Sequence, residues 1–81
     1  LIKLTIAPNP FNNATSIEFE NPKREKLNLQ MLNALGQSVL QINNITDSKV
    51  QIDRNGLPNG LYFIQIIRDS HVIGADKIVI E

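Results

Sequence analysis

The side chains that could carry chemistry in this sequence are few, and they lie far apart along the chain. The single histidine, His71, follows Asp69 and Ser70 in a predicted turn, with no second histidine and no cysteine to complete a zinc site. Glu18 and Glu20 share the exposed face of one predicted strand, about 7 Å apart by the strand rise, where water solvates both carboxylates. We therefore expect a solvated turn residue and a solvated strand face.

The remaining aspartates and serines form no pattern that catalysis or metal binding requires. The aspartates lie on separate loops and strands, and their spacing matches no calcium-binding loop. The serines lack the glycine-flanked turn that exposes a nucleophilic serine, and no partner base is evident. The residues considered are Asp47, Asp53, Asp69, Asp76, Ser16, Ser38, Ser48 and Ser70. The sequence thus predicts no enzyme, no metal site and no cofactor.

The composition argues against further classes of function. The chain has 81 residues, with eight Lys plus Arg against eight Asp plus Glu, and this balance lacks the basic field of a nucleic-acid-binding domain. No apolar run approaches the ~18 residues of a membrane span, so we expect no membrane insertion. A chain of this length folds around one core, and we expect residues 1–81 to form a single domain. Since the chain begins at Leu1 without an initiator methionine, we expect it to be a piece of a longer polypeptide.

Apolar and polar residues alternate along most of the chain with the period of two that is typical of β-strands. The stretch from Leu61 to Ile67 is apolar on both faces, which favours a central strand. Asn33 to Gly36 predicts a hairpin turn, and Gly74 predicts a bulge in the last strand, Val72 to Ile80. The side chains expected on buried strand faces are Ile2, Leu4, Ile6, Thr15, Ile17, Phe19, Leu27, Leu29, Met31, Val50 and Ile52.

Seven short strands separated by polar turns predict an all-β fold of the seven-stranded immunoglobulin-like β-sandwich type. A small open barrel is the alternative, because the spacing of the strands does not fix their topology. The densest cluster of turn residues, Arg54 to Gly60, precedes the most apolar strand. Among the few aromatic residues, Phe19 and Phe63 are expected to point into the core.

Four short motifs follow one another along the chain. They are Pro8-Asn9-Pro10-Phe11, Asn33-Ala34-Leu35-Gly36-Gln37, Gly56-Leu57-Pro58-Asn59-Gly60-Leu61-Tyr62 and Lys77-Ile78-Val79-Ile80-Glu81. In this order and spacing, the chain resembles the C-terminal sorting domain of the type IX secretion system. That family stands at the C-terminus of many secreted proteins of Bacteroidota-type bacteria, and the resemblance covers essentially the whole sequence.

The resemblance implies a sandwich fold and a domain that is a substrate of secretion rather than an enzyme. It implies an attached upstream cargo protein, which reaches the periplasm by its own N-terminal signal and then passes through the outer-membrane translocon. In the family, a sortase-like peptidase at the cell surface usually removes the domain, here upstream of Leu1, and the cargo is released or attached to lipopolysaccharide. The implied partners are the translocon components, the peptidase and the cargo, and the implied location is the cell surface or the medium.

Several residues match the family motifs individually. We expect the translocon to recognise the late elements, which correspond to Gly60, Tyr62, Lys77, Ile78 and Val79. A structural or recognition role is expected for the other motif residues, with the structural role favoured for Gly36. These residues are Pro8, Asn9, Pro10, Phe11, Gly36, Leu57 and Pro58. The paired prolines would fix the chain as it leaves the first strand.

The terminal strand suggests how recognition could work. A free backbone edge along Asp76 to Glu81 would allow a translocon component to add a strand, and it would also allow two copies of the domain to pair weakly. Many family members carry two basic residues where this chain has Asp76 and Lys77. We expect the carboxylate of Asp76 to cancel the local positive field of Lys77.

A second function of another class remains open at this point. The chain could be an accessory β-sandwich module that binds glycans, or that spaces a secreted enzyme from its surface. Glycan modules of this architecture expose two or three aromatic rings on one face. Burial of both Phe11 and Tyr62 would therefore favour the sorting domain, whereas exposure of both in one plane would favour sugar binding.

Overall fold

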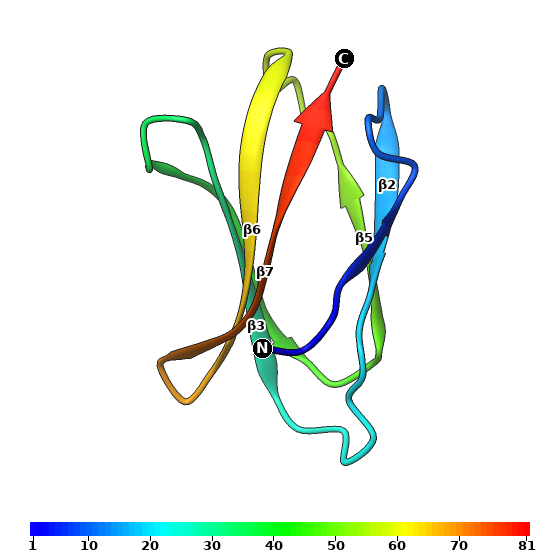
Figure 1. Ribbon diagram of the computed structural model, residues 1–81, viewed down its shortest axis with the longest axis vertical. Helices are drawn as coiled ribbons and strands as arrows, with labels where there is room; N and C mark the ends of the chain where they lie inside the picture. Colours follow the sequence, from blue (N-terminus) through cyan, green and yellow to red (C-terminus); the bar gives the residue numbers. More distant parts are fainter.

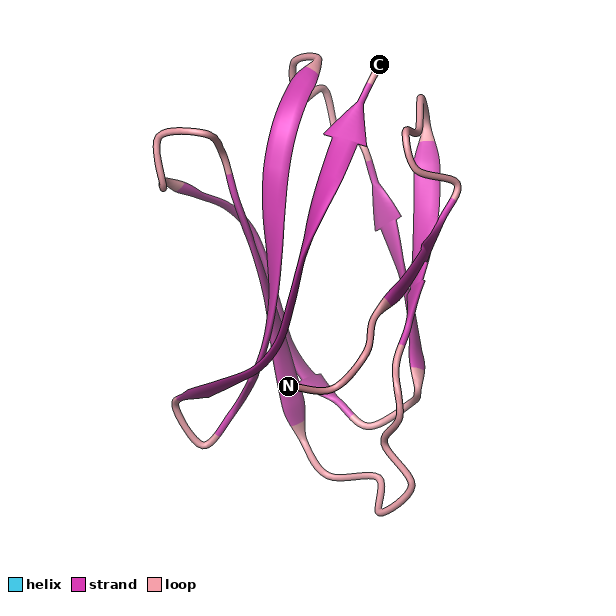
Figure 2. Ribbon diagram, in the orientation of Figure 1, coloured by secondary structure: helices cyan, strands magenta, loops and turns pink.

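The computed structural model describes residues 1–81 as seven β-strands without a helix (Figures 1 and 2). The strands are β1 (Thr5–Ala7), β2 (Ala14–Glu18), β3 (Leu27–Leu32), β4 (Ser38–Ile45), β5 (Lys49–Asp53), β6 (Gly60–Arg68) and β7 (His71–Ile80). They form two antiparallel sheets, with the strand orders β1-β2-β5 and β4-β3-β6-β7. The two sheets face each other in Figure 1, which confirms the predicted immunoglobulin-like sandwich over the open barrel. The chain forms no helix that could cross a membrane.

The core lies between the two sheets and consists of alternate strand residues. The largest fully buried side chains are Ile17, Leu27, Leu29, Met31, Ile52, Ile64, Ile66, Ile78 and Ile80. β6 lies between β3 and β7, as expected for a strand that is apolar on both faces. Thr15 is the one buried polar residue, and its hydroxyl donates a hydrogen bond of 2.6 Å to the carbonyl oxygen of Pro8. This bond compensates the burial of the hydroxyl.

Phe63 is where the expected core differs from the structure. Along β6 the buried side chains include Tyr62 and Ile64, so Phe63 lies on the opposite, outer face and is only partly buried. The prediction that Phe63 points inward is wrong, whereas Phe19 is buried as predicted. A strand that is apolar on both faces has no alternation by which the sequence could separate its inner face from its outer face.

The first strand is shorter than the alternation predicts. β1 begins only at Thr5, and the residues before it run along the edge of β7, where the Ile2 N–H donates to the carbonyl oxygen of Ile73 at 2.7 Å. Leu4 is 7% exposed and belongs to the core. The N-terminal segment thus passes from the edge of one sheet to the other and covers one side of the sandwich (Figure 1).

The bulge that the sequence predicts at Gly74 lies directly beside it. The register between β6 and β7 shifts between Ile66 and Ile67, which makes Ile73 the extra residue of β7. A Cβ atom on Gly74 would lie 2.9 Å from Cγ1 of Ile2. The missing side chain therefore lets the N-terminal segment approach β7 closely.

Gly74→Ala is expected to lower the free energy of unfolding by about 1–3 kcal/mol, because the added methyl group displaces Ile2 from β7. Adding Ile2→Ala removes the clashing atom, so the double variant should lose less than the two single variants together. Urea denaturation of the two single variants and the double variant measures this coupling. Strictly additive losses would show that Gly74 and Ile2 do not interact.

Candidate recognition surface

Three of the four motifs come together at one end of the sandwich, the end at which the C-terminus lies in Figure 1. We call this region the motif surface and define it as residues 8–12, 54–60 and 77–81. The fourth motif, the hairpin turn between β3 and β4, projects from another part of the molecule. In that turn Gly36 has a φ of +82°, the structural role that the sequence predicts for it.

Asn9 joins the first motif to the last. The Val79 N–H donates to Oδ1 of Asn9 at 2.9 Å, and Nδ2 of Asn9 donates to the carbonyl oxygen of Lys77 at 3.2 Å. The carboxamide of Asn9 thus takes the place of a peptide group of a neighbouring strand. Its flanking residues, Pro8 and Pro10, have no N–H of their own to offer, and the peptide bonds preceding both prolines are cis.

Phe11 and Asn12 continue this pairing to the end of the chain. The Phe11 N–H donates to the carbonyl oxygen of Val79 at 3.0 Å, and the Glu81 N–H donates to the carbonyl oxygen of Phe11 at 2.9 Å. Nδ2 of Asn12 adds a hydrogen bond of 3.2 Å to the carbonyl oxygen of Glu81. The Phe11 ring is only 2% exposed, so the same segment also contributes to the core.

The edge of β7 is therefore closed where the sequence predicts a free edge. Besides the bonds above, the Lys77 N–H donates to Oδ1 of Asp76 at 2.8 Å. The prediction that Asp76 to Glu81 presents an open backbone edge is wrong, because side chains and backbone of residues 9–12 already occupy it. A partner could add a strand here only after displacing that segment. Asp76 covers an edge N–H, a role that its charge alone does not reveal.

Tyr62 holds the turn that precedes β6. Its hydroxyl donates a hydrogen bond of 2.6 Å to the carbonyl oxygen of Pro58, and its ring is 3% exposed. Leu57, in the same turn, packs against the core. Gly60 ends the turn with a φ of +154°, a conformation that side-chain-bearing residues rarely adopt.

Arg54 connects all three segments of the motif surface. Its Nε donates to the carbonyl oxygen of Leu57 at 2.9 Å, and its Nη2 bonds Oδ1 of Asn59. Its Nη1 donates to the carbonyl oxygens of Asn12 at 3.3 Å and Glu81 at 3.0 Å. The forked guanidinium suits this task because it offers five donors in a rigid plane. Sequence reasoning missed Arg54, and its position at the start of the densest turn cluster was the only signal.

The predicted recognition residues differ in their exposure. Gly60 and Lys77 are exposed and Val79 is partly exposed, whereas Tyr62 and Ile78 are buried. In the folded domain the side chains of Tyr62 and Ile78 therefore pack in the core beneath the motif surface and are not accessible to a partner. Because Phe11 and Tyr62 are both buried, no aromatic pair is available there to stack on a sugar.

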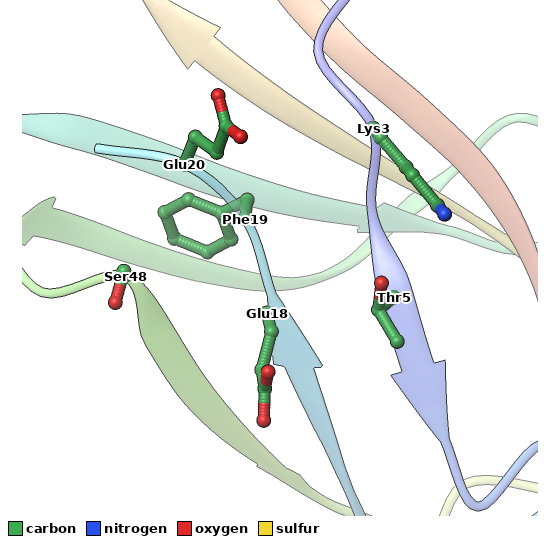
Figure 3. Close-up of a pocket in the computed structure, with 6 residues that line it drawn as sticks. All are labelled: Lys3, Thr5, Glu18, Phe19, Glu20 and Ser48. Carbon is green, nitrogen blue, oxygen red and sulfur yellow. The ribbon is translucent and has the colours of Figure 1, made fainter. Parts of the chain in front are cut away.

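The acidic residues that the sequence pointed out lie away from this surface. Figure 3 shows a shallow hollow beside β1 and β2, in which the carboxylates of Glu18 and Glu20 point away from each other. Glu18 instead forms an exposed ion pair of 3.7 Å with Lys49. No three side chains of the metal-binding types are grouped so that they could hold a metal ion. The sequence places His71 in a turn, but the turn consists of Asp69 and Ser70, and His71 is the exposed first residue of β7 because it pairs with Arg68 of β6. Its Nδ1 lies 2.8 Å from the carbonyl oxygen of Asp69.

The fold and the site define a small β-sandwich domain in which hydrogen bonds join three sequence motifs on one surface. The sequence model of the family described as the secretion system C-terminal sorting domain matches residues 5–81. The chain belongs to this family, the type IX sorting domains that the four motifs predict. No curated protein matches the chain. The family is not a catalytic one, and membership implies attachment to a cargo, interaction with the secretion machinery and export to the outer membrane, the cell surface or the medium.

Proposed function

We propose that this domain, after transit through the periplasm, directs an upstream cargo protein through the outer-membrane translocon of the type IX system. A sortase-like peptidase at the cell surface then cleaves the chain upstream of Leu1. The observation that carries the proposal is the convergence of three motifs, distant in sequence, on one surface held by Arg54 and Asn9. Because the three motifs lie on one surface, a single partner protein could contact all of them at once, which it could not do if they were separate turns.

Recognition uses the folded motif surface rather than an open strand edge. Lys77, Val79 and the turn at Gly60 offer exposed groups to a partner, and the buried side chains of Tyr62 and Ile78 fix the backbone beneath them. Asp76 turns its carboxylate to the Lys77 N–H, and Lys77 forms no ion pair, so its ammonium group stays available to an acidic partner.

A reporter fusion tests the proposal. Residues 1–81 are fused behind a periplasm-directed fluorescent protein and expressed in a bacterium with a type IX system. The reporter is expected at the cell surface or in the medium, and it should stay in the periplasm when the translocon is deleted. A reporter that stays in the periplasm of the intact host, with the domain folded, would overturn the assignment.

Lys77→Ala in this fusion is expected to leave the free energy of unfolding within about 0.5 kcal/mol, since the side chain is exposed and unpaired. Export should nevertheless fall several-fold, because the partner loses a charge contact. Lys23→Ala is the matched control: Lys23 is also exposed and unpaired, and it lies outside the motif surface. Equal export of both variants would remove Lys77 from the recognition surface.

A further inference from the structure

The four outer strands of the sandwich differ in whether they can accept another strand. The edge of β7 is closed by residues 2 and 9–12. β1 has only three residues and runs into Pro8. β4 is longer, but its register with β3 shifts twice, and such bulges twist an edge away from regular pairing. β5 pairs with β2 without any shift, which leaves it as the one regular edge of the molecule.

The backbone of β5 faces outward at every second residue. The β2–β5 ladder extends beyond the strand ends, because the Arg54 N–H bonds the carbonyl oxygen of Asn13 at 2.9 Å and the Phe19 N–H bonds that of Ser48 at 3.0 Å. In an antiparallel ladder, residues whose N–H and C=O groups point toward the partner strand alternate with residues whose groups point away from it. Ser48 and Arg54 point toward β2, and so do Val50 and Ile52 between them. The N–H and C=O groups that point away from β2 are therefore those of Lys49, Gln51 and Asp53, and none of them forms a hydrogen bond to a group outside the ladder.

We propose that two copies of this domain associate through β5, antiparallel, about a twofold axis at Gln51. This register places Lys49 opposite Asp53 of the second copy, Gln51 opposite Gln51, and Asp53 opposite Lys49. Because all three pairs join outward-facing residues, all of them are of the hydrogen-bonded type, and every open N–H and C=O group of both edges gains a partner. The two three-stranded sheets become one continuous sheet.

The charge pattern of β5 favours a second copy over other occupants. Read in the opposite direction, Lys-Val-Gln-Ile-Asp matches a cation to an anion, an aliphatic residue to an aliphatic residue, and an amide to an amide. Parallel pairing in register would instead place Lys49 against Lys49, and a shift of two residues would break both ion pairs. Lys49, Gln51 and Asp53 are exposed on the outer face, where these cross-strand pairs would form, and Ile52 stays in the core. The twofold register is thus the one that satisfies both backbone and charge.

The association is expected to be weak. A pair of five-residue strands buries less surface than the ~1,200 Å² at which stable interfaces begin, so we expect dissociation constants of about 0.1–1 mM. Weak pairing would matter mainly where many cargo molecules are crowded together. The inference does not depend on recognition by the translocon, since β5 lies outside the motif surface.

Sedimentation of the 81-residue chain at increasing concentration, together with NMR spectra of the backbone amides, tests this inference. We expect a monomer–dimer equilibrium in which the amide signals of Lys49, Gln51 and Asp53 shift with concentration. A chain that stays monomeric up to about 2 mM would overturn the proposal. Concentration-dependent shifts of amide signals confined to β4 or β7 would also overturn it. The same holds if an added strand peptide of unrelated sequence shifts the signals of β5 but a higher concentration of the chain itself does not.

Charge-reversal variants identify the register. Asp53→Lys places like charges opposite each other twice, so dimerisation should weaken at least about tenfold. The double variant Lys49→Asp with Asp53→Lys restores both ion pairs in reversed order and should dimerise within about threefold of the unchanged chain. Both positions are exposed. Lys49→Asp also replaces the exposed ion pair with Glu18 of β2 by two carboxylates, an effect of less than about 1 kcal/mol at a solvated position, so the fold should persist, and far-UV circular dichroism verifies it. A double variant as weak as the single variant would contradict the twofold register.

Discussion

Ile78→Ala is expected to lower the free energy of unfolding by about 2–4 kcal/mol, a large share of the roughly 4–12 kcal/mol available to a domain of this size. Ile78 is fully buried, and β7 pairs it with Tyr62, so the removed carbons leave a cavity between the sheets. Urea denaturation followed by circular dichroism measures the loss. The reporter fusion should lose most of its export as well, because the strand that carries Lys77 and Val79 loosens.

The matched control for Ile78→Ala is Val72→Ala, which removes methyl groups from the same strand at a position that is 42% exposed. This variant is expected to lose less than about 1 kcal/mol. Equal losses at the two positions would mean that the end of β7 is not packed as the structure has it.

Arg54→Met should open the motif surface. The substitution keeps the aliphatic stem but removes the hydrogen bonds to Leu57, Asn12 and Glu81, and we expect a loss of about 1–3 kcal/mol. Arg54→Lys should recover less than half of this, since one ammonium group cannot reach three segments in the geometry of a planar fork. NMR signals of residues 9–12, 57–60 and 79–81 are expected to shift together, and export should fall.

Arg24→Met provides the comparison for Arg54→Met. Arg24 is exposed, and its one side-chain bond is an ion pair of 3.2 Å with Asp47, so its replacement should change stability by less than about 0.5 kcal/mol. If Arg54→Met shifts only the signals of the turn at Leu57 and Asn59, then Arg54 is a local turn residue and not the connection between the motifs.

The sequence predicted the parts of the fold that depend on local alternation. Leu27, Leu29 and Met31 are buried on one face of β3 as expected, because a one-residue shift would expose all three. Phe63 was misplaced because its strand is apolar on both sides. The family motifs were recognisable, yet their common position was not, since it depends on contacts between residues far apart in the chain.

The roles of Asn9 and Arg54 could not be read from the sequence for the same reason. Asn9 pairs with the backbone of Lys77 and Val79, and this requires a register between two segments that no local pattern specifies. Arg54 bonds backbone carbonyl groups rather than carboxylates, so no complementary charge in the sequence points to its partners. The free edge predicted for β7 was wrong because the residues that cover it form no strand of their own.

The pairing of Asn9 and Phe11 with Val79 joins positions about seventy residues apart, so the two ends of the chain are held side by side. A translation product that ends before Lys77 leaves Asn9 and Phe11 without their backbone partners in β7, and it leaves Arg54 without its bond to Glu81. Such a fragment retains the bonds of Arg54 to Asn12, Leu57 and Asn59 but lacks the third segment of the motif surface. The complete motif surface therefore forms only in a product that contains residues 77–81, so an export system that binds all three segments would not export a product that stops before them.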